Sequence, residues 1–159
     1  MIERVPPQNI EAEQAVIGGM LIEKEAISKV AEFLKADDFY REAHRLIFEA
    51  MLELFNKNEA VDLVTVTEVL RKNDKLEAVG GIAYITSLAN SVPTAANINY
   101  HGKIVEEKAL LRGLINSATH IASMGYEDTE AVADIIDKAE KMLAWTPKRS
   151  LTQMIEDEW

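Results

Sequence analysis

The chain has 159 residues and a formal net charge of −10 at pH 7, so it is long enough for about one domain with a real hydrophobic core. Its acidic balance argues against a nucleic-acid groove, because phosphate binding depends on clustered lysine and arginine, so we expect little direct binding of DNA. The absence of cysteine excludes disulfides and thiolate metal sites, and without an apolar run of roughly 20 residues or a secretory signal we expect a cytoplasmic protein that does not enter a membrane.

Sparse proline and glycine and little β-branched alternation predict an all-α fold. After an arm that contains Pro6-Pro7, Asn9 is expected to cap a first helix of about residues 10–22. Gly18 and Gly19 lie in the middle of that helix, where each costs roughly 1 kcal/mol relative to alanine. A cost of this kind suggests close packing against another backbone.

Two more helices are expected before residue 56. The first has one apolar face and is broken at Asp37-Asp38, after which Phe39 can fill the core; the face consists of Ile27, Val30, Ala31 and Leu34. The second covers about residues 40–55 and carries the clearest stripe of this half: His44, Ile47, Phe48, Met51, Leu52 and Phe55. Both stripes are predicted to lie in the core.

Thr65 and Glu68 have the spacing of a capping box, which predicts that a fourth helix begins at Val66. A short strand over residues 61–66 is an alternative, but it has no evident partner. Gly80-Gly81 then opens a short helix whose inward residues are expected to be Ile82, Ile85 and Leu88.

Residues 90–97 contain Pro93 and form a plausible internal boundary, and residues 97–145 resemble two long helices folded back on each other. Gly125 is expected to end the first of them in a left-handed conformation, with Asp128 or Thr129 capping the second. We therefore divide the chain into a globular helical bundle (1–90), a hairpin (91–145) and a tail or linker segment (146–159).

The first hairpin helix carries two apolar stripes, whereas its partner has one dominant stripe. One stripe runs through Ile104, Leu111, Ile115, Ala118 and Ala122, and the other through Leu110, Leu114, Ile121 and Met124. The second helix contributes Val132, Ile135, Ile136, Ala139, Met142 and Leu143. Periodicity leaves two readings open for the surplus stripe: the globular half folds over it, or another copy of the chain covers it.

The sequence contains no recognisable catalytic motif. The phosphate-binding string G-x-x-x-x-G-K-[ST] is absent, and His44, His101 and His120 lack the i, i+3 or i+4 partners of a helical metal site. His44 is expected to be a histidine at the edge of the core and not a ligand. We therefore expect no metal, no cofactor and no enzymatic activity in this chain alone.

Pro147 should end the second hairpin helix, and Ser150 could cap a last amphipathic turn or two that carries Leu151, Met154, Ile155 and Trp159. A frayed terminus is the alternative reading of this tail. The pattern alone does not choose between them.

Four strings together resemble the amino-terminal domain of the bacterial replicative DNA helicase of the DnaB type: PPQNIEAEQAVIGGML, DDFYREAHRLIFEAM, VDLVTVTEVL and GGIAYITSLANSVPTAANINYHGKIVEEKALLRGLI. The resemblance covers about residues 4–145, and residues 146–159 do not match the family's linker. It implies a bundle that carries a hairpin, hairpins that pair into dimers, and a hexameric collar that is a trimer of dimers. It further implies binding to the helicase-binding domain of primase and to a helicase loader, while ATP and Mg²⁺ belong to a motor domain that is not in this sequence.

On this resemblance, we expect the dimer interface to contain Ile104, Leu111, Ile115, Ala118, Ala122, Ile135, Ile136 and Met142. Glu11, Tyr84 and Tyr100 are candidates for the partner surface, because of their positions in the chain and because tyrosine is enriched at interfaces. The runner-up hypothesis is the helicase-binding domain of a primase, which resembles the same hairpin-bearing bundle.

Overall fold

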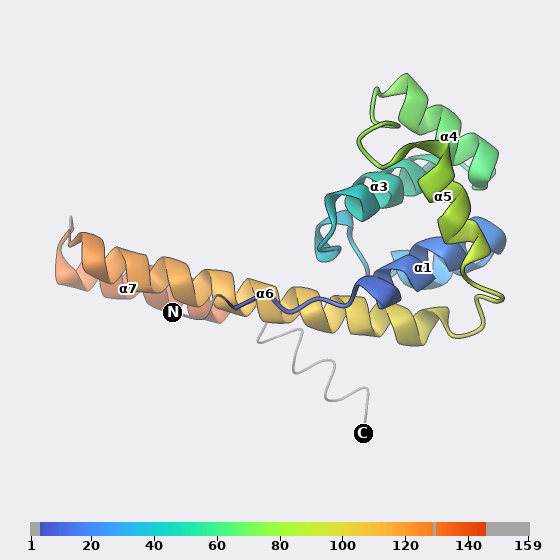
Figure 1. Cartoon of the computed structure of the whole chain (residues 1–159). Coiled ribbons are helices and arrows are strands. Elements are labelled where there is room, and N and C mark those ends of the chain that lie inside the picture. The colour runs from blue at the N-terminus through green and yellow to red at the C-terminus, as the bar shows by residue number, and fades with distance from the viewer. Residues whose placement is uncertain (1–3, 129, 146–159) are drawn as a thin grey trace. The chain divides into compact units, whose positions relative to one another are not determined.

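The computed structural model describes residues 4–128 and 130–145, and in these ranges the chain is helical without a strand (Figure 1). The predicted all-α fold class is thus confirmed, and the alternative strand over residues 61–66 is wrong. The expected cap at Thr129 and the expected tail helix after Ser150 lie outside the described residues.

The helices follow one another in the order α1 (Ile10–Ile22), α2 (Ala26–Ala31), the 3₁₀ turn η1 (Ala36–Asp38), α3 (Glu42–Asn56), α4 (Leu63–Lys72), α5 (Gly81–Asn90), α6 (Ile98–Glu127) and α7 (Val132–Trp145). By its internal contacts the chain divides into two compact units, and the division falls inside α6. We call residues 8–109 the bundle unit, and residues 1–7 with 110–159 the hairpin unit. The predicted boundaries at residues 90 and 145 stay predictions.

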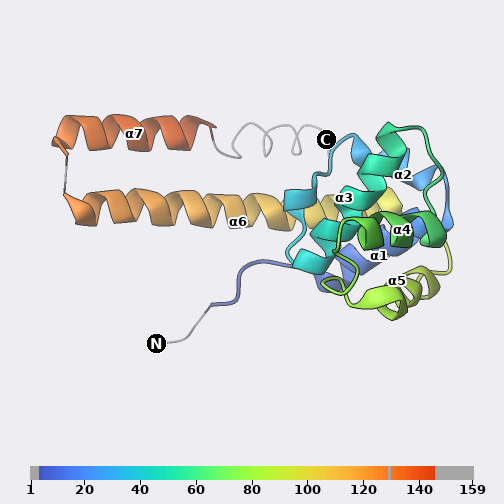
Figure 2. The same ribbon diagram turned by 90° about the horizontal axis from the view of Figure 1, so that it is seen from above.

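The bundle unit is built around α1, which contacts α2, α3 and α5 (Figures 1 and 2). Asn9 caps α1 as predicted, since its side-chain oxygen accepts a hydrogen bond from the Ala12 amide at 2.9 Å. The close approach expected at Gly18 is also present: a Cβ there would lie 2.4 Å from the carbonyl oxygen of Leu88. The middle glycine therefore lets α1 and α5 pack backbone to backbone.

The core of the bundle unit contains most of the predicted inward residues. Ile47, Phe48 and Met51 of α3 are buried, and Phe39 is buried at the end of η1. Leu52 and Phe55 are half-buried against the same core. Ile82 is the exception, because 46 % of its surface is exposed, so its predicted inward position in α5 is wrong. The start of α5 is opened by Gly80, whose φ of 100° is left-handed.

The start of α4 differs from the prediction by three residues. Asp62, and not Thr65, is the N-cap: its carboxylate accepts from the Thr65 amide at 2.9 Å, and the Thr65 hydroxyl accepts from the Asp62 amide at 2.9 Å. Thr65 is thus the third residue of the helix in a reciprocal capping box. Glu68 forms an ion pair with Arg71 and does not cap the helix.

In the hairpin unit, the distal part of α6 and α7 run antiparallel (Figure 2). α6 continues through Gly125 to Glu127, and Asp128 takes the left-handed conformation with a φ of 45°. The predicted left-handed end at Gly125 is therefore wrong, because the helix continues to Glu127. The predicted capping role of Asp128 is also wrong, because α7 begins only at Val132. The N-terminal arm belongs to this unit, where an Arg112 guanidinium nitrogen donates to the Pro7 carbonyl at 2.8 Å.

Candidate protein-interaction surfaces

The distal part of α6 carries an exposed row of residues, which we call the outer seam: Leu111, Ile115, Ala118, Ala122 and Gly125. The spacing of four, three, four and three residues places them on one face of a helix. Leu111 is 40 % exposed and Ile115 is 48 % exposed, although both are large and apolar. The described part of the chain leaves this face uncovered.

A second row of residues on the same helix is half-buried, and we call it the inner seam: Leu110, Ser117, Ile121 and Met124. On α7, the half-buried residues are Ile135, Ala139 and Met142, again at helical spacing. Because α6 and α7 run antiparallel in one compact unit, these two rows are the ones that the hairpin covers by itself. One of the two predicted stripes is thus used within the hairpin, except that Leu114 is 45 % exposed.

The eight residues expected at a dimer interface differ in their location and in their exposure to solvent. Ile104 lies in the bundle unit and packs against its core. Leu111, Ile115, Ala118 and Ala122 are exposed on the outer seam, whereas Ile135 and Met142 are half-buried on α7. Ile136 is 52 % exposed. Val132 and Leu143 are exposed apolar residues of α7 that were not among the eight, although their spacing from Ile136 indicates the same helical face.

Tyr84 lies in a buried polar network that joins three elements of the bundle unit. Glu13 on α1 is 1 % exposed and His44 on α3 is 0 % exposed. Nδ1 of His44 is 2.7 Å from a Glu13 carboxylate oxygen, and Nε2 of His44 is 2.6 Å from the Tyr84 hydroxyl. The second Glu13 oxygen accepts from the Tyr40 amide at 2.7 Å. The core histidine predicted from the sequence is confirmed.

Tyr84 has two further hydrogen-bond partners in this network. Its hydroxyl oxygen accepts from Arg41 at 3.3 Å and from Gln14 at 3.5 Å. His44 thus links the Glu13 carboxylate to the Tyr84 hydroxyl through its two ring nitrogens. The Glu13 carboxylate and the His44 ring are buried and hydrogen-bonded, so the network joins α1, α3 and α5 within the bundle unit.

The other two candidate partner-surface residues lie apart from this network. Glu11 is exposed in the first turn of α1. Tyr100 is 70 % exposed near the start of α6, with its ring edge toward His101 at a centroid distance of 6.4 Å. No hydrogen bond or ring contact within the described residues brings Glu11, Tyr84 and Tyr100 together into one site.

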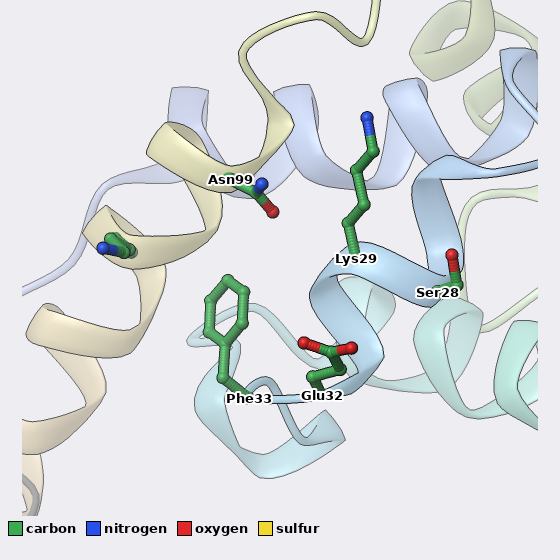
Figure 3. Close-up of a pocket in the computed structure, with 6 residues that line it drawn as sticks. Ser28, Lys29, Glu32, Phe33 and Asn99 are labelled. Carbon is green, nitrogen blue, oxygen red and sulfur yellow. The ribbon is translucent and has the colours of Figure 1, made fainter.

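A groove of about 380 Å³ lies in the bundle unit between α2 and the first turns of α6 (Figure 3). It is lined by Ser28, Lys29, Glu32, Phe33, Asn99 and Lys103. The two walls meet at Gly102, where a Cβ would lie 2.8 Å from Cζ of Phe33. This groove was not predicted, because its walls are about 70 residues apart in the sequence and neither carries a recognisable motif.

Neither a cluster of metal-binding side chains nor a membrane-spanning helix is present in the described ranges. Residues 4–128 and 130–145 hold no group of three or more His, Asp or Glu side chains placed to bind a metal ion. In the same ranges, none of the helices combines the length and the apolar character that a bilayer-spanning segment requires.

A globular helical bundle, a helical hairpin and exposed apolar residues along the hairpin are features of a protein-interaction domain. Residues 5–107 match the family of DnaB-like helicase N-terminal domains, and the chain belongs to this family. The family membership expected from the four sequence strings is thereby confirmed.

The curated relatives are longer proteins. The chain is 51 % identical over 155 residues to the replicative DNA helicase DnaC of Bacillus subtilis, covering 98 % of this chain and 34 % of that protein. It is 46 % identical over 147 residues to the replicative DNA helicase DnaB of Geobacillus stearothermophilus, covering 92 % and 32 %. The chain thus spans about a third of these relatives. The expectation that similarity ends near residue 145 is wrong, because an alignment of 155 residues must extend into the last fourteen.

Two solved structures are similar to the chain. The N-terminal domain of DnaB helicase from Mycobacterium tuberculosis superposes with a TM-score of 0.85 at 42 % identity, covering 88 % of this chain and 99 % of that one. A DnaB-like replicative helicase, described with its interactions with primase, has a TM-score of 0.71 at 29 % identity, covering 94 % and 34 %. The likeness therefore extends across both units of the chain.

Proposed function

We propose that this chain is the oligomerisation and docking domain of a hexameric replicative DNA helicase that acts in the bacterial cytoplasm. In this proposal its hairpins pair into dimers, three dimers form an amino-terminal collar, and the collar binds primase and a helicase loader. Unwinding and ATP hydrolysis belong to the rest of the helicase, beyond the third that this chain spans. The observation that carries the proposal is the uncovered outer seam of α6.

The sizes of the outer-seam residues support one particular pairing. They decrease along α6 from Leu111 and Ile115 through Ala118 and Ala122 to Gly125. If two copies of α6 pack antiparallel about Ala118, Leu111 faces Gly125 of the other copy and Ile115 faces Ala122. Each large side chain then meets a small one, which is the condition for close packing of two helices without voids or clashes.

Gly125 gives independent support to this pairing. It lies inside a helix, where glycine costs about 1 kcal/mol relative to alanine, and its φ is not left-handed. A Cβ at this position would have no neighbour within 4 Å. The fold of the chain itself therefore gives no reason for glycine here, whereas a leucine approaching from a second copy does.

Size-exclusion chromatography with light scattering, over a range of protein concentrations, tests the pairing. We expect a dimer that dissociates on dilution. A protein that stays monomeric at the highest attainable concentration would overturn the proposed dimer and leave the docking function open.

Docking of primase is supported by a similar protein, since the DnaB-like helicase described above was solved with its interactions with primase. On this chain, the candidate residues are Glu11, Tyr84 and Tyr100. Tyr84 is held by hydrogen bonds from two sides, so it would be presented in a fixed orientation at low entropic cost. Membership of the helicase family leaves the runner-up, a primase helicase-binding domain, without an observation in its favour.

Isothermal titration of the chain with the helicase-binding domain of the cognate primase tests this part of the proposal. Mass measurement of the complex would give the number of primase domains per dimer. We expect saturable binding; its absence, with the dimer intact, would refute primase docking and leave the oligomerisation function standing.

A further inference from the structure

Tyr126 is a large side chain that the fold of the chain leaves in water. It lies one residue before the end of α6, and 91 % of its surface is exposed. Among the described residues, its ring and its hydroxyl take part in no ring contact and no hydrogen bond. Tyrosine is enriched at protein interfaces, where the ring packs and the hydroxyl stays hydrated. The hairpin therefore carries an aromatic group for an external contact beside Gly125 of the outer seam.

The position of Tyr126 on α6 is defined by its helical spacing. Arg112, Thr119 and Tyr126 follow one another at intervals of seven residues, so they lie in one row along the helix. At about 100° per residue, this row lies on one side of the outer seam, and the inner seam, which faces α7, lies on the other. The row thus borders the outer seam on the flank that α7 does not cover.

The Arg112 end of this flank holds the N-terminal arm. The Arg112 guanidinium donates to the Pro7 carbonyl at 2.8 Å, and both residues belong to the hairpin unit. Pro6 is exposed and Pro7 is half-buried, in a segment without helical structure before α1. Proline rings in an extended segment are a surface on which aromatic side chains pack well, because the segment is already stiff before it binds. The flank therefore has an aromatic ring at one end and a proline surface at the other.

The proposed antiparallel pairing about Ala118 brings these two ends together. A two-fold axis places each flank of one helix against the same flank of its partner, and every contact occurs twice. Thr119 then lies near Thr119 of the second copy. Because Arg112 and Tyr126 are each seven residues from Thr119, Tyr126 of one copy lies opposite Arg112 of the other.

We infer that Tyr126 of each copy packs on the Pro6-Pro7 segment of the other copy, with its ring over the Arg112 guanidinium that holds this segment. The inference rests on the proposed dimerisation and extends the interface from α6 to the N-terminal arm. A ring over a guanidinium group is favourable, since the cation is attracted to the face of the ring. The hydrogen bond between Arg112 and Pro7 fixes the receiving surface in advance, which lowers the entropic cost of the contact.

Substitutions of Tyr126 in the full chain, followed by sedimentation equilibrium, test the role of the ring. Tyr126→Ala should weaken the dimer by roughly tenfold or more, because each dimer loses two aromatic contacts. Tyr126→Phe keeps the ring and should stay within about threefold of the wild type. The matched control is Tyr100→Ala, which removes another exposed tyrosine from the same helix but in the bundle unit, and should leave the dissociation constant unchanged.

The receiving surface is tested by Pro6→Gly combined with Pro7→Gly. This variant keeps the carbonyl that Arg112 binds but removes both rings and the stiffness of the arm, so it should weaken the dimer severalfold. Adding Tyr126→Ala to it should cause little further loss, because the two changes remove the same contact. Fully additive losses would show that Tyr126 and the arm do not touch.

Cross-linking gives a direct test, because the sequence contains no cysteine. Chains with Pro6→Cys and chains with Tyr126→Cys are mixed, allowed to exchange subunits and treated with a short bismaleimide that replaces the length of the tyrosine side chain. We expect a covalent dimer from the mixture and none from Tyr126→Cys alone. In the proposed pairing, the two copies of position 126 lie about 24 Å apart along the helix axes, beyond the reach of the reagent.

Each alternative outcome has a separate meaning. A wild-type dimer with neither a mixed cross-link nor a loss in Tyr126→Ala would overturn the arm contact and leave dimerisation standing. A wild type that stays monomeric would overturn the proposed dimer and the arm contact with it. A cross-link from Tyr126→Cys alone would indicate parallel helices and overturn both the pairing about Ala118 and this contact.

Discussion

The two units of this chain bury their apolar residues to different extents. Every buried apolar side chain of the described ranges lies between Ala12 and Val105, in the bundle unit. In the hairpin unit, no described side chain is buried to the same degree, and six large aliphatic residues of α6 and α7 remain exposed: Leu111, Leu114, Ile115, Val132, Ile136 and Leu143. The bundle buries a core of its own, whereas the hairpin leaves an apolar face exposed, which is the face that we propose as the dimer interface.

The largest effect should come from the buried network of the bundle unit. His44→Leu leaves the buried Glu13 carboxylate with only the Tyr40 and Arg41 amides as partners, which should cost about 3 kcal/mol of the free energy of unfolding. Urea denaturation, followed by circular dichroism at a fixed protein concentration, measures this loss. Tyr84→Phe is the milder companion, because it removes one hydroxyl and should cost about 1 kcal/mol. A loss for His44→Leu no larger than for Tyr84→Phe would contradict the assigned network.

The second prediction addresses the hairpin. Ile115→Asp places a carboxylate in the middle of the outer seam, so it should weaken dimerisation by roughly a hundredfold or more, since each dimer would bury two unpaired charges. Asn116→Asp is the matched control, because it introduces the same carboxylate at the adjacent exposed position outside the seam. Sedimentation equilibrium measures both dissociation constants. Equal dissociation constants would show that the outer seam is not the interface.

The contrast between the units also shows how far the sequence alone could go. Helical periodicity and one cap were sufficient to predict α1 with its observed bounds, and two stripes were recognised on α6. Periodicity could not decide which stripe the hairpin covers, because both have the same spacing. The pairing of Glu13 with His44 joins residues 31 positions apart, and the groove joins α2 to α6; contacts of this kind depend on tertiary packing, which no local pattern specifies.

The errors have local physical causes. Thr65 and Glu68 fit the capping box as well as Asp62 and Thr65 do, but the earlier pair adds a full turn of helix and was the one observed. Gly125 has the residue type of a helix end, but a glycine is also favoured where another helix comes close. The residue type alone did not distinguish these two roles.

A smaller effect is expected at the cap of α4. Asp62→Ala removes the acceptor for the Thr65 amide and should cost about 1 kcal/mol of the stability of the bundle unit. Asp62→Asn keeps an acceptor and should cost much less, while Glu68→Ala removes only an exposed ion pair worth about 0–1 kcal/mol. Thermal unfolding ranks the three. Dimerisation should be unchanged, because α4 lies outside the hairpin, and a weakened dimer would mean that the two units are coupled.

The smallest effect provides the sharpest test of the pairing. Gly125→Ala should stabilise an isolated α6 by up to about 1 kcal/mol, because alanine is the better helix former and the added Cβ has no neighbour within 4 Å in the chain. In the proposed antiparallel dimer, the same methyl group meets Leu111 of the other copy, so dimerisation should weaken by a few-fold. Thermal unfolding of Gly125→Ala in the Ile115→Asp monomer isolates the first effect, and sedimentation equilibrium without Ile115→Asp gives the second. A more stable monomer together with a weaker dimer would support the pairing about Ala118. A tighter dimer would exclude this pairing, because a Leu111 packed closely against Gly125 leaves no space for an added methyl group.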